Sequence, residues 1–141
     1  MRKGENMPLE FFMAITPPTT TSQMKRIRIR NGKPTFYDSR KMKAARNEFH
    51  AHLLQFQPGT PIEGAIRLIT KWCYPTSKQH PGPKYKITRP DTDNMIKMLK
   101  DEMTKAGFWL DDAQVASEIT EKFWADPPGI YVRVEQLENK I

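Results

Sequence analysis

The segment from Asp93 to Ala106 constrains the fold most, because its pattern predicts one element with one buried face. Its apolar residues recur three and four positions apart, at Ile96, Leu99, Met103 and Ala106. This spacing is typical of one face of an α-helix. Gly107 follows at the position where glycine commonly ends a helix. We therefore predict a helix over about Asp93–Ala106 that packs one apolar face against the rest of the chain.

The remaining segments predict strands around a second helix. Alternating apolar residues and turn signals predict strands at residues 9–15, 63–74, 115–124 and 130–135, and a β-hairpin over 25–37 turned by Asn31-Gly32. Helical spacing predicts a helix from Asp38 or Ser39 to about Phe56. This order predicts an α+β fold, with two main helices packed on one face of a mixed sheet. The length of 141 residues favours a single domain over residues 1–141.

Charge is distributed unevenly along the chain. Residues 1–100 carry 19 Lys and Arg against 7 Asp and Glu, whereas residues 101–141 carry 4 against 9. The formal net charge of +7 suggests an anionic partner such as a nucleic acid. A basic surface beside a local acidic cluster is the arrangement that a metal-dependent nucleic-acid enzyme requires.

The single cysteine and the absence of a long apolar run bear on the compartment. Cys73 cannot form an intramolecular disulfide, which favours a reducing compartment, and we expect the cytoplasm. The apolar run near the N-terminus is short and interrupted by Glu10, so it is typical of a strand and not of a signal peptide. No stretch is long enough to span a membrane, and we expect no membrane partner.

Two basic segments are candidates for contacts with phosphate groups. In the hairpin, Arg26, Arg28 and Arg30 alternate with isoleucines and project to one side of an extended chain. The long loop over residues 75–90 carries three further candidates, Lys84, Lys86 and Arg89. Long loops in compact domains are usually functional or disordered. The alternative interpretation of the hairpin is a solvated edge strand protected by its charges.

Asp91 and Asp93 are separated by one residue at the predicted start of the second helix. Side chains two positions apart diverge by about 200° within a helix, whereas in an extended segment they point the same way. Pro90 disfavours helical geometry at Arg89, and Asp93 can serve as an N-cap with extended backbone. We therefore expect both carboxylates to be directed at one point, with the helix beginning right after them. Capping alone is the alternative interpretation.

A cation and a third carboxylate complete the candidate site. Lys97 lies four residues after Asp93 and therefore on the same side of the helix. Asp111 or Asp112 follows at a strand entrance, where we expect the FWL triplet to be anchored in the core. Mg²⁺ takes oxygen ligands and keeps several waters, so two or three carboxylates with open positions suit phosphodiester hydrolysis. The residues predict a metal-dependent nuclease in which a lysine stabilises charge on the phosphate.

Residues 89–115, RPDTDNMIKMLKDEMTKAGFWLDDAQV, resemble the signature of the RusA-type Holliday junction resolvases. The resemblance extends more loosely over the N-terminal strand followed by PPT and over the YDSRKMKAARNEF helix. It implies a small homodimeric Mg²⁺-dependent endonuclease of bacteria, phages or prophages, in which Mn²⁺ can substitute. It also implies that the enzyme resolves four-way junctions by paired symmetric nicks in DNA recombination and repair. A twofold dimer would match the symmetry of the junction.

The resemblance assigns roles to individual residues. The catalytic positions of the family fall on Asp91, Asp93, Lys97 and Asp112, and the three aspartates are the metal ligands. It favours Asp112 over Asp111 as the third ligand. Asn94 belongs to the motif, either as a structural support of the ligands or with a part in catalysis. Asp101 matches a recurrent acidic position that faces the site and would orient the metal ligands without binding the ion itself.

Two other functions remain open from the sequence. The first is a structure-selective nuclease for flaps or other branched DNA, which would differ in the symmetry of its nicks. The second is a catalytically inactive phage DNA-binding protein, which would give no product with any divalent ion. An RNA-binding module finds little support, because no aromatic-rich strand motif of the RNP type is present.

Overall fold

The computed structural model describes residues 7–19, 26–37 and 39–138. Five strands form one sheet in the order β1-β7-β4-β6-β5. Their bounds are β1 Leu9–Met13, β4 Ile66–Tyr74, β5 Lys84–Tyr85, β6 Val115–Trp124 and β7 Gly129–Gln136. The central pair β4 and β6 is parallel, while the other three pairings are antiparallel. The prediction of a mixed sheet is therefore confirmed.

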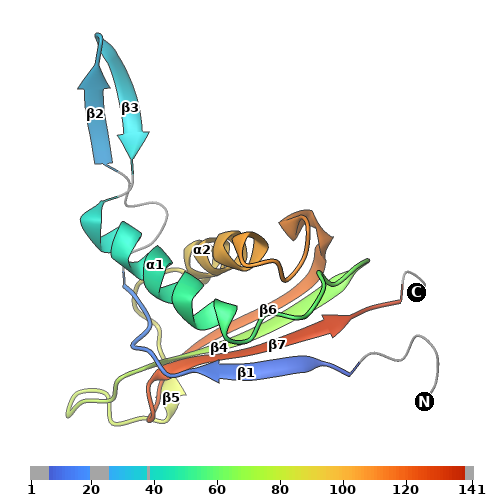
Figure 1. The fold of residues 1–141 in the computed structure, drawn as a ribbon. Helices are drawn as coiled ribbons and strands as arrows, with labels where there is room; N and C mark the ends of the chain where they lie inside the picture. Colours follow the sequence, from blue (N-terminus) through green and yellow to red (C-terminus); the bar gives the residue numbers. More distant parts are fainter. Residues whose placement is uncertain (1–6, 20–25, 38, 139–141) are drawn as a thin grey trace.

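Two helices cover one face of this sheet (Figure 1). They are α1 (Arg40–Leu54) and α2 (Thr92–Lys105). Ser39 caps α1, since its side chain accepts a hydrogen bond from the backbone N–H of Met42. Because β4 and β6 are parallel, the chain must cross the sheet between them, and α2 makes that crossing. The predicted α+β class with two main helices is confirmed.

The core lies between the helices and the sheet. The predicted stripe of α2 is buried in full, at Ile96, Leu99, Met103 and Ala106. Beneath it the sheet contributes alternate residues of its strands, among them Leu68, Trp72, Val132 and Val134. The ring of Phe49 from α1 meets the ring of Trp72 edge-on, with centroids 5.9 Å apart. The helical and alternating patterns in the sequence therefore identify the buried faces correctly.

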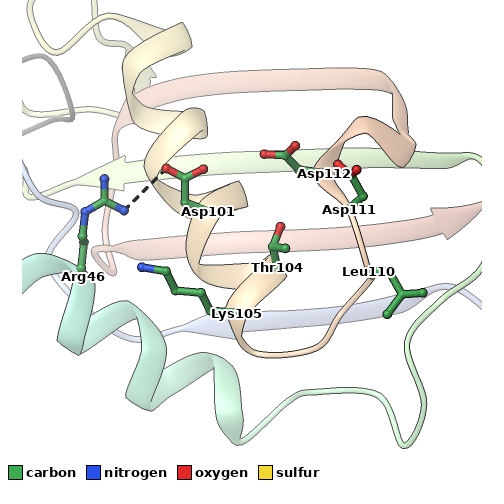
Figure 2. Close-up of a pocket in the computed structure, with 7 residues that line it drawn as sticks. All are labelled: Arg46, Asp101, Thr104, Lys105, Leu110, Asp111 and Asp112. Atoms are coloured by element: carbon green, nitrogen blue, oxygen red, sulfur yellow. Dashed lines mark ion pairs between the residues drawn. The ribbon is translucent and has the colours of Figure 1, made fainter.

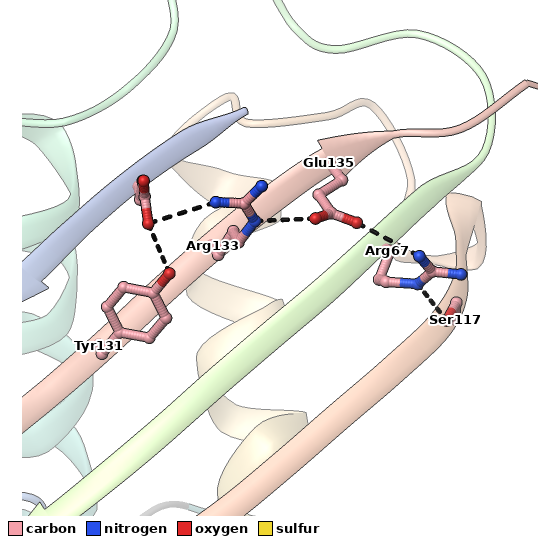
Figure 3. A network of polar contacts seen from close by, with 6 residues as sticks. Arg67, Ser117, Tyr131, Arg133 and Glu135 are labelled. Atoms are coloured by element: carbon pink, nitrogen blue, oxygen red, sulfur yellow. Dashed lines mark hydrogen bonds and ion pairs between the residues drawn. The ribbon is translucent and has the colours of Figure 1, made fainter. Parts of the chain in front are cut away.

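The outer face of the sheet carries a polar network across four strands (Figure 3). Its members are Glu10, Arg67, Ser117, Tyr131, Arg133 and Glu135. Glu135 joins two of the strands, because it accepts from Arg133 at 2.8 Å and from Arg67 at 3.4 Å. The hydrogen bond from Arg133 lowers the pKa of the Glu135 carboxyl. These cross-strand pairs satisfy the solvent-facing side of the strands, whose other side forms the core.

The basic hairpin is separate from the main sheet. Strands β2 (Arg26–Arg30) and β3 (Lys33–Tyr37) pair only with each other among the described residues, and they stand away from the helices in Figure 1. Asn31 and Gly32 both have positive φ, at 50° and 74°. Those values match the two-residue turn that the Asn-Gly pair predicts.

Three details of the fold differ from the sequence prediction. The second helix begins at Thr92 with Asp91 at the N-cap, so the predicted start after Asp93 is wrong. The first helix ends at Leu54, short of Phe56. The loop over residues 75–90 contains the short strand β5, which pairs with β6 and stacks the Tyr85 ring on Phe123. A strand of two residues is too short to produce a periodic pattern.

No helix in the described part of the chain is long and apolar enough to cross a bilayer.

Gly129, at the start of β7, gives a test of the sheet packing. A Cβ at this position would lie 2.6 Å from the carbonyl oxygen of Met13 and closer still to the ring of Phe12. We expect Gly129→Ala to lower the free energy of unfolding by about 1–3 kcal/mol, the usual cost of overpacking, as measured by guanidinium denaturation. Gly59→Ala is the matched control, since a Cβ there meets nothing within 4 Å. Equal stabilities of the two variants would contradict the packing.

Candidate active site

The start of α2 presents two carboxylates in different ways. Asp91 occupies the N-cap with extended backbone, at φ −72° and ψ 145°, but its side chain makes no capping hydrogen bond. Asp93 lies inside the first turn, and its Oδ1 accepts from the backbone N–H of Asn94 at 3.0 Å. The positive end of the helix dipole favours negative charge at both positions. Only Asp91 is therefore in the extended segment that the sequence predicted for the pair.

The exposed side of α2 continues from this pair along the helix. Lys97 and Asp101 follow Asp93 at four and eight residues, so the three occupy one side in successive turns. Lys97 is exposed, opposite the buried stripe. Asp101 is half-buried and pairs with Arg46 of α1 at 3.6 Å. The rise of a helix places Asp101 about 12 Å along the axis from Asp93.

The segment that follows α2, from Gly107 to Asp112, brings two further aspartates close to the helix. Gly107, at φ 86°, turns the chain, and Phe108 and Trp109 are fully buried as predicted. The Trp109 indole N–H donates to Thr104 Oγ1 at 2.7 Å, which fixes the segment against the last turn of α2. Leu110 is 78% exposed, so the prediction that it anchors the core is wrong. The two buried rings hold this segment together with the backbone hydrogen bond from Ile62 to the carbonyl of Phe108 at 2.8 Å.

Asp111 and Asp112 differ in what their carboxylates do. Asp111 is the N-cap of a short 3₁₀ helix, η1 (Asp112–Gln114), and its Oδ1 accepts from the backbone N–H of Ala113 at 2.9 Å. Gln114 completes the capping box by accepting from the backbone of Asp111 at 3.1 Å. Within the described residues, the Asp112 carboxylate has no hydrogen-bond or ion-pair partner. Asp112 is thus the member of the pair that is available to a ligand.

A cavity of about 430 Å³ lies between η1 and the C-terminal part of α2. It is lined by Arg46, Asp101, Thr104, Lys105, Leu110, Asp111 and Asp112 (Figure 2). In Figure 2 the carboxylate of Asp112 points from η1 toward α2, on the side where Asp101 pairs with Arg46. The cavity therefore brings Asp101 and Asp112 together, whereas Asp91, Asp93, Asn94 and Lys97 do not line it.

Arg46 is a residue of this site that the sequence did not reveal. Its guanidinium spans from α1 to two neighbouring carboxylates of α2, reaching Glu102 at 3.0 Å as well as Asp101. Glu102 is buried and also pairs with Lys105 at 3.2 Å. The packing of α1 on α2 creates this contact across 56 positions, and no local motif signals it.

The acidic residues form two groups and not one cluster. Among residues 7–19, 26–37 and 39–138, no three His, Cys, Asp or Glu side chains gather closely enough to hold a metal ion between them. Asp91 and Asp93 belong to the start of α2, and Asp112 belongs to η1 beyond its other end. Lys97 lies between the two groups on the helix. The three predicted ligands are therefore not assembled around one point in the isolated chain.

The residues predicted to contact DNA differ in their exposure to solvent. Arg28, Arg30, Lys84 and Arg89 are exposed, whereas the side chain of Arg26 lies outside the described residues. Lys86 is only 5% exposed, and its ammonium donates to Thr88 Oγ1 at 2.6 Å and to the Arg89 carbonyl at 2.7 Å. A lysine oriented inward in this way is not positioned to contact DNA. We therefore withdraw Lys86 from the DNA-binding set.

Comparison with known proteins identifies the family. The family model described as endodeoxyribonuclease RusA matches residues 16–135. A crossover junction endodeoxyribonuclease of Lactococcus phage r1t is 32% identical over 113 residues, covering 77% of this chain and 83% of the relative. The uncharacterised protein YqaN of Bacillus subtilis is 28% identical over 120 residues, covering 77% and 84%. The RusA crossover junction endodeoxyribonuclease of Escherichia coli K12 is 67% identical over 27 residues, 19% of this chain and 22% of the relative.

The family model covers most of the chain, including α2, η1 and every acidic residue of the candidate site. The phage relative matches along most of its own length as well. The chain therefore belongs to the RusA family of endodeoxyribonucleases.

Proposed function

We propose that this protein is a Mg²⁺-dependent endodeoxyribonuclease that resolves four-way DNA junctions by paired symmetric nicks, in DNA recombination and repair. The observation that carries the proposal is the exposed side of α2, where Lys97 stands one turn from Asp93 and one turn from Asp101. A phosphate held by Lys97 would lie one helical turn from the Asp93 carboxylate. That carboxylate can bind the divalent ion that offsets the charge of the phosphate. Membership of the RusA family supports nuclease chemistry, and the phage relative is named for action on crossover junctions.

The carboxylates supply the donor atoms that a hard divalent ion requires. Asp91 does not use its side chain for capping, and Asp112 points into the space between η1 and α2 (Figure 2). Mg²⁺ is commonly bound by one or two carboxylates, with water and substrate phosphate completing its shell, so a preformed set of three is not required. We assign Asp91, Asp93 and Asp112 as ligands of one or two Mg²⁺ ions, and Mn²⁺ would substitute. The bound ion would polarise the phosphate and promote ionisation of a water molecule.

Neighbouring side chains would hold the phosphate and the ligands in place. The ammonium of Lys97 would contact a phosphate oxygen and stabilise the negative charge that grows in the transition state. The backbone N–H of Asn94 orients Asp93 through its hydrogen bond to Oδ1. Asp101, held by Arg46 on the wall of the cavity, would orient water beside Asp112.

Exposed cations away from the helix would bind the arms of the DNA. Arg28 and Arg30 project from the hairpin, while Lys84 and Arg89 lie on the loop that leads into α2. Contacts of this kind release counterions, so the affinity would fall steeply as salt concentration rises. Arg26 belongs to the same alternating row in the sequence and is assigned with them.

Two copies of the chain, acting as a dimer, would make the two nicks. A twofold homodimer presents two identical sites, and a four-way junction has matching symmetry. Each copy would then cut one of two strands placed symmetrically about the branch point. The cytoplasm, where such junctions form in bacteria and in phage infection, is the proposed compartment.

The first prediction concerns the products. With Mg²⁺, the full-length protein should cut an end-labelled mobile four-way junction at two positions related by symmetry, and it should cut flaps and linear duplex more slowly. Mapping of the cuts on all four strands is the measurement. Unpaired nicks with a preference for flaps would indicate a flap nuclease instead. No product with any divalent ion would indicate a DNA-binding protein without catalytic activity.

The second prediction concerns Asp93. We expect Asp93→Asn to lower the rate of junction cleavage by at least about a hundredfold, the scale of losing one group that stabilises the transition state. Junction binding should persist, because the change removes a negative charge close to phosphate. Cleavage rates and gel-shift affinities measure the two effects. Retained Mg²⁺-dependent cleavage in this variant would rule out the assigned site.

The third prediction separates the neighbouring aspartates. Asp112→Asn should lower the cleavage rate by at least about a hundredfold, since it removes a ligand. Asp111→Asn should cleave close to the wild-type rate, because Asn caps a helix as well as Asp does. The two variants carry the same chemical change one residue apart, so each controls for the other in single-turnover assays. The reverse result would make Asp111 the ligand.

A further inference from the structure

Lys86 is a charged side chain that its neighbours cover almost completely. It lies just beyond β5 and is 5% exposed, and its Nζ sits 4.3 Å from the centroid of the Trp124 ring and 5.1 Å from that of Tyr74. Contacts between an ammonium and aromatic faces are favourable, but a buried charge is costly unless hydrogen bonds replace its water. The ammonium must therefore be held by specific acceptors.

The acceptors of Lys86 lie in the segment that leads into α2. Its Nζ donates to Thr88 Oγ1 at 2.6 Å and to the carbonyl oxygen of Arg89 at 2.7 Å. The backbone N–H of Lys86 donates to the carbonyl of Lys122 at 2.9 Å, which joins this segment to β6. The side chain thus reaches forward along its own loop to hold residues two and three positions later.

Lys122 holds the same segment from the sheet. Its Nζ donates to the carbonyl oxygen of Thr88 at 2.5 Å and to that of Pro90 at 2.6 Å. The carbonyls of three consecutive residues, Thr88, Arg89 and Pro90, therefore all accept from these two lysines. We call Lys86 and Lys122 the lysine clamp. The next residue along the chain is Asp91.

The clamp places two positive charges close together at an energetic cost. Burial lowers the pKa of Lys86, and the charge of Lys122 lowers it further. Within the described part of the chain, neither ammonium has a carboxylate within ion-pair distance. The two ammonium groups donate to three main-chain carbonyls and to the Thr88 hydroxyl, and this arrangement fixes the backbone of residues 88–90.

Asp91 depends on that backbone for its orientation. Its side chain makes no capping hydrogen bond, and its own carbonyl is already fixed by the backbone N–H of Met95 at 3.1 Å. With the preceding three carbonyls held by the clamp, the Asp91 backbone is fixed on both sides. The direction of its carboxylate then follows from the backbone and the choice of rotamer.

We propose that Lys86 and Lys122 are positioning residues that fix the Thr88–Pro90 backbone and thereby set the affinity of the Asp91 carboxylate for its divalent ion. The inference rests on the proposed function only in taking Asp91 as a metal ligand. The lysines touch neither the ion nor the phosphate in this scheme. They act as outer partners of a ligand, a class of residue whose loss typically weakens metal affinity by about 10–100-fold.

The test compares three variants of the full-length protein. Lys86→Met and Lys122→Met each keep an apolar stem of similar length and remove the ammonium. Lys78→Met is the matched control, since Lys78 is exposed in the same loop and its loss also removes one positive charge. Isothermal titration with Mn²⁺, without DNA, gives the metal affinity of each protein. Cleavage assays over a range of Mg²⁺ concentrations then give kcat and KM for a four-way junction.

Each clamp variant should bind Mn²⁺ at least about tenfold more weakly than the wild type. Each should also need more Mg²⁺ for half-maximal cleavage, while KM for the junction at saturating Mg²⁺ stays close to that of the wild type. Lys78→Met should leave the Mn²⁺ affinity unchanged. The double variant should be little worse than either single one, because both lysines fix the same segment.

Several results would overturn the proposal. Clamp variants that bind Mn²⁺ as the wild type does would show that the lysines only stabilise the loop or bind DNA, even if KM rises. If Lys86→Met fails to fold, Lys122→Met decides alone, since Lys122 is less buried and its loss leaves no empty space in the core. A wild-type protein that binds Mn²⁺ but cuts no DNA would overturn the proposed function and leave the clamp to be judged on Mn²⁺ affinity. A wild-type protein that binds no Mn²⁺ would overturn both.

Discussion

The parallel pairing of β4 with β6 is the constraint on which the rest of the structure depends. Parallel neighbours cannot be joined by a tight turn, so the chain must cross the sheet between Tyr74 and Val115. This crossing carries α2, η1 and the loop that contains β5. Every residue assigned to metal or to the reacting phosphate lies within it. The central strands therefore hold these residues between two fixed points, and α1 adds Arg46 from outside the crossing.

The crossing also explains why the acidic residues form two groups. Helix α2 separates Asp91 and Asp93 at its start from the acidic residues that follow its end. After α2 the chain turns back along the helix and is held there by Trp109. This turn places Asp112 beside Asp101 on the cavity wall. One side of the helix then presents acid, base and acid in successive turns. Lys97 is the member of this row that can contact a phosphate directly, whereas the flanking carboxylates can approach a phosphate only through a bound cation.

Much of the fold could be predicted because burial follows periodicity. The spacing of Ile96, Leu99 and Met103 identified the buried side of α2, and alternation identified the inner side of β7. The features that were missed depend on contacts between distant segments. Strand β5 forms by pairing with the free edge of β6. The burial of Lys86 depends on Trp124, which lies 38 positions away in the sequence. A lysine within a polar, proline-rich loop otherwise looks like any surface lysine.

The sequence named most residues of the candidate site but predicted their arrangement less well. The sequence supplied the aspartates and Lys97, but it placed Asp93 before the helix, whereas the N-cap is Asp91. The expected convergence of the pair rested on that placement. The preference for Asp112 over Asp111 gains physical support from the capping box, which occupies the Asp111 carboxylate. The contact of Arg46 with Asp101 had no sequence signal, because it arises only when α1 packs against α2.

The lysine clamp has a consequence for how this segment can vary among relatives. Three of its four acceptors are main-chain carbonyls, which every amino acid possesses, so the clamp imposes almost no requirement on which side chain stands at position 89. The clamp itself would therefore tolerate another residue in place of Arg89. A change of Lys86 or Lys122 would instead remove the donors of the clamp, and a change of Tyr74 or Trp124 would remove a ring that lies against Lys86. The side chain at position 89 can therefore be exchanged without disturbing the backbone that leads to Asp91, although the two residues are only two positions apart.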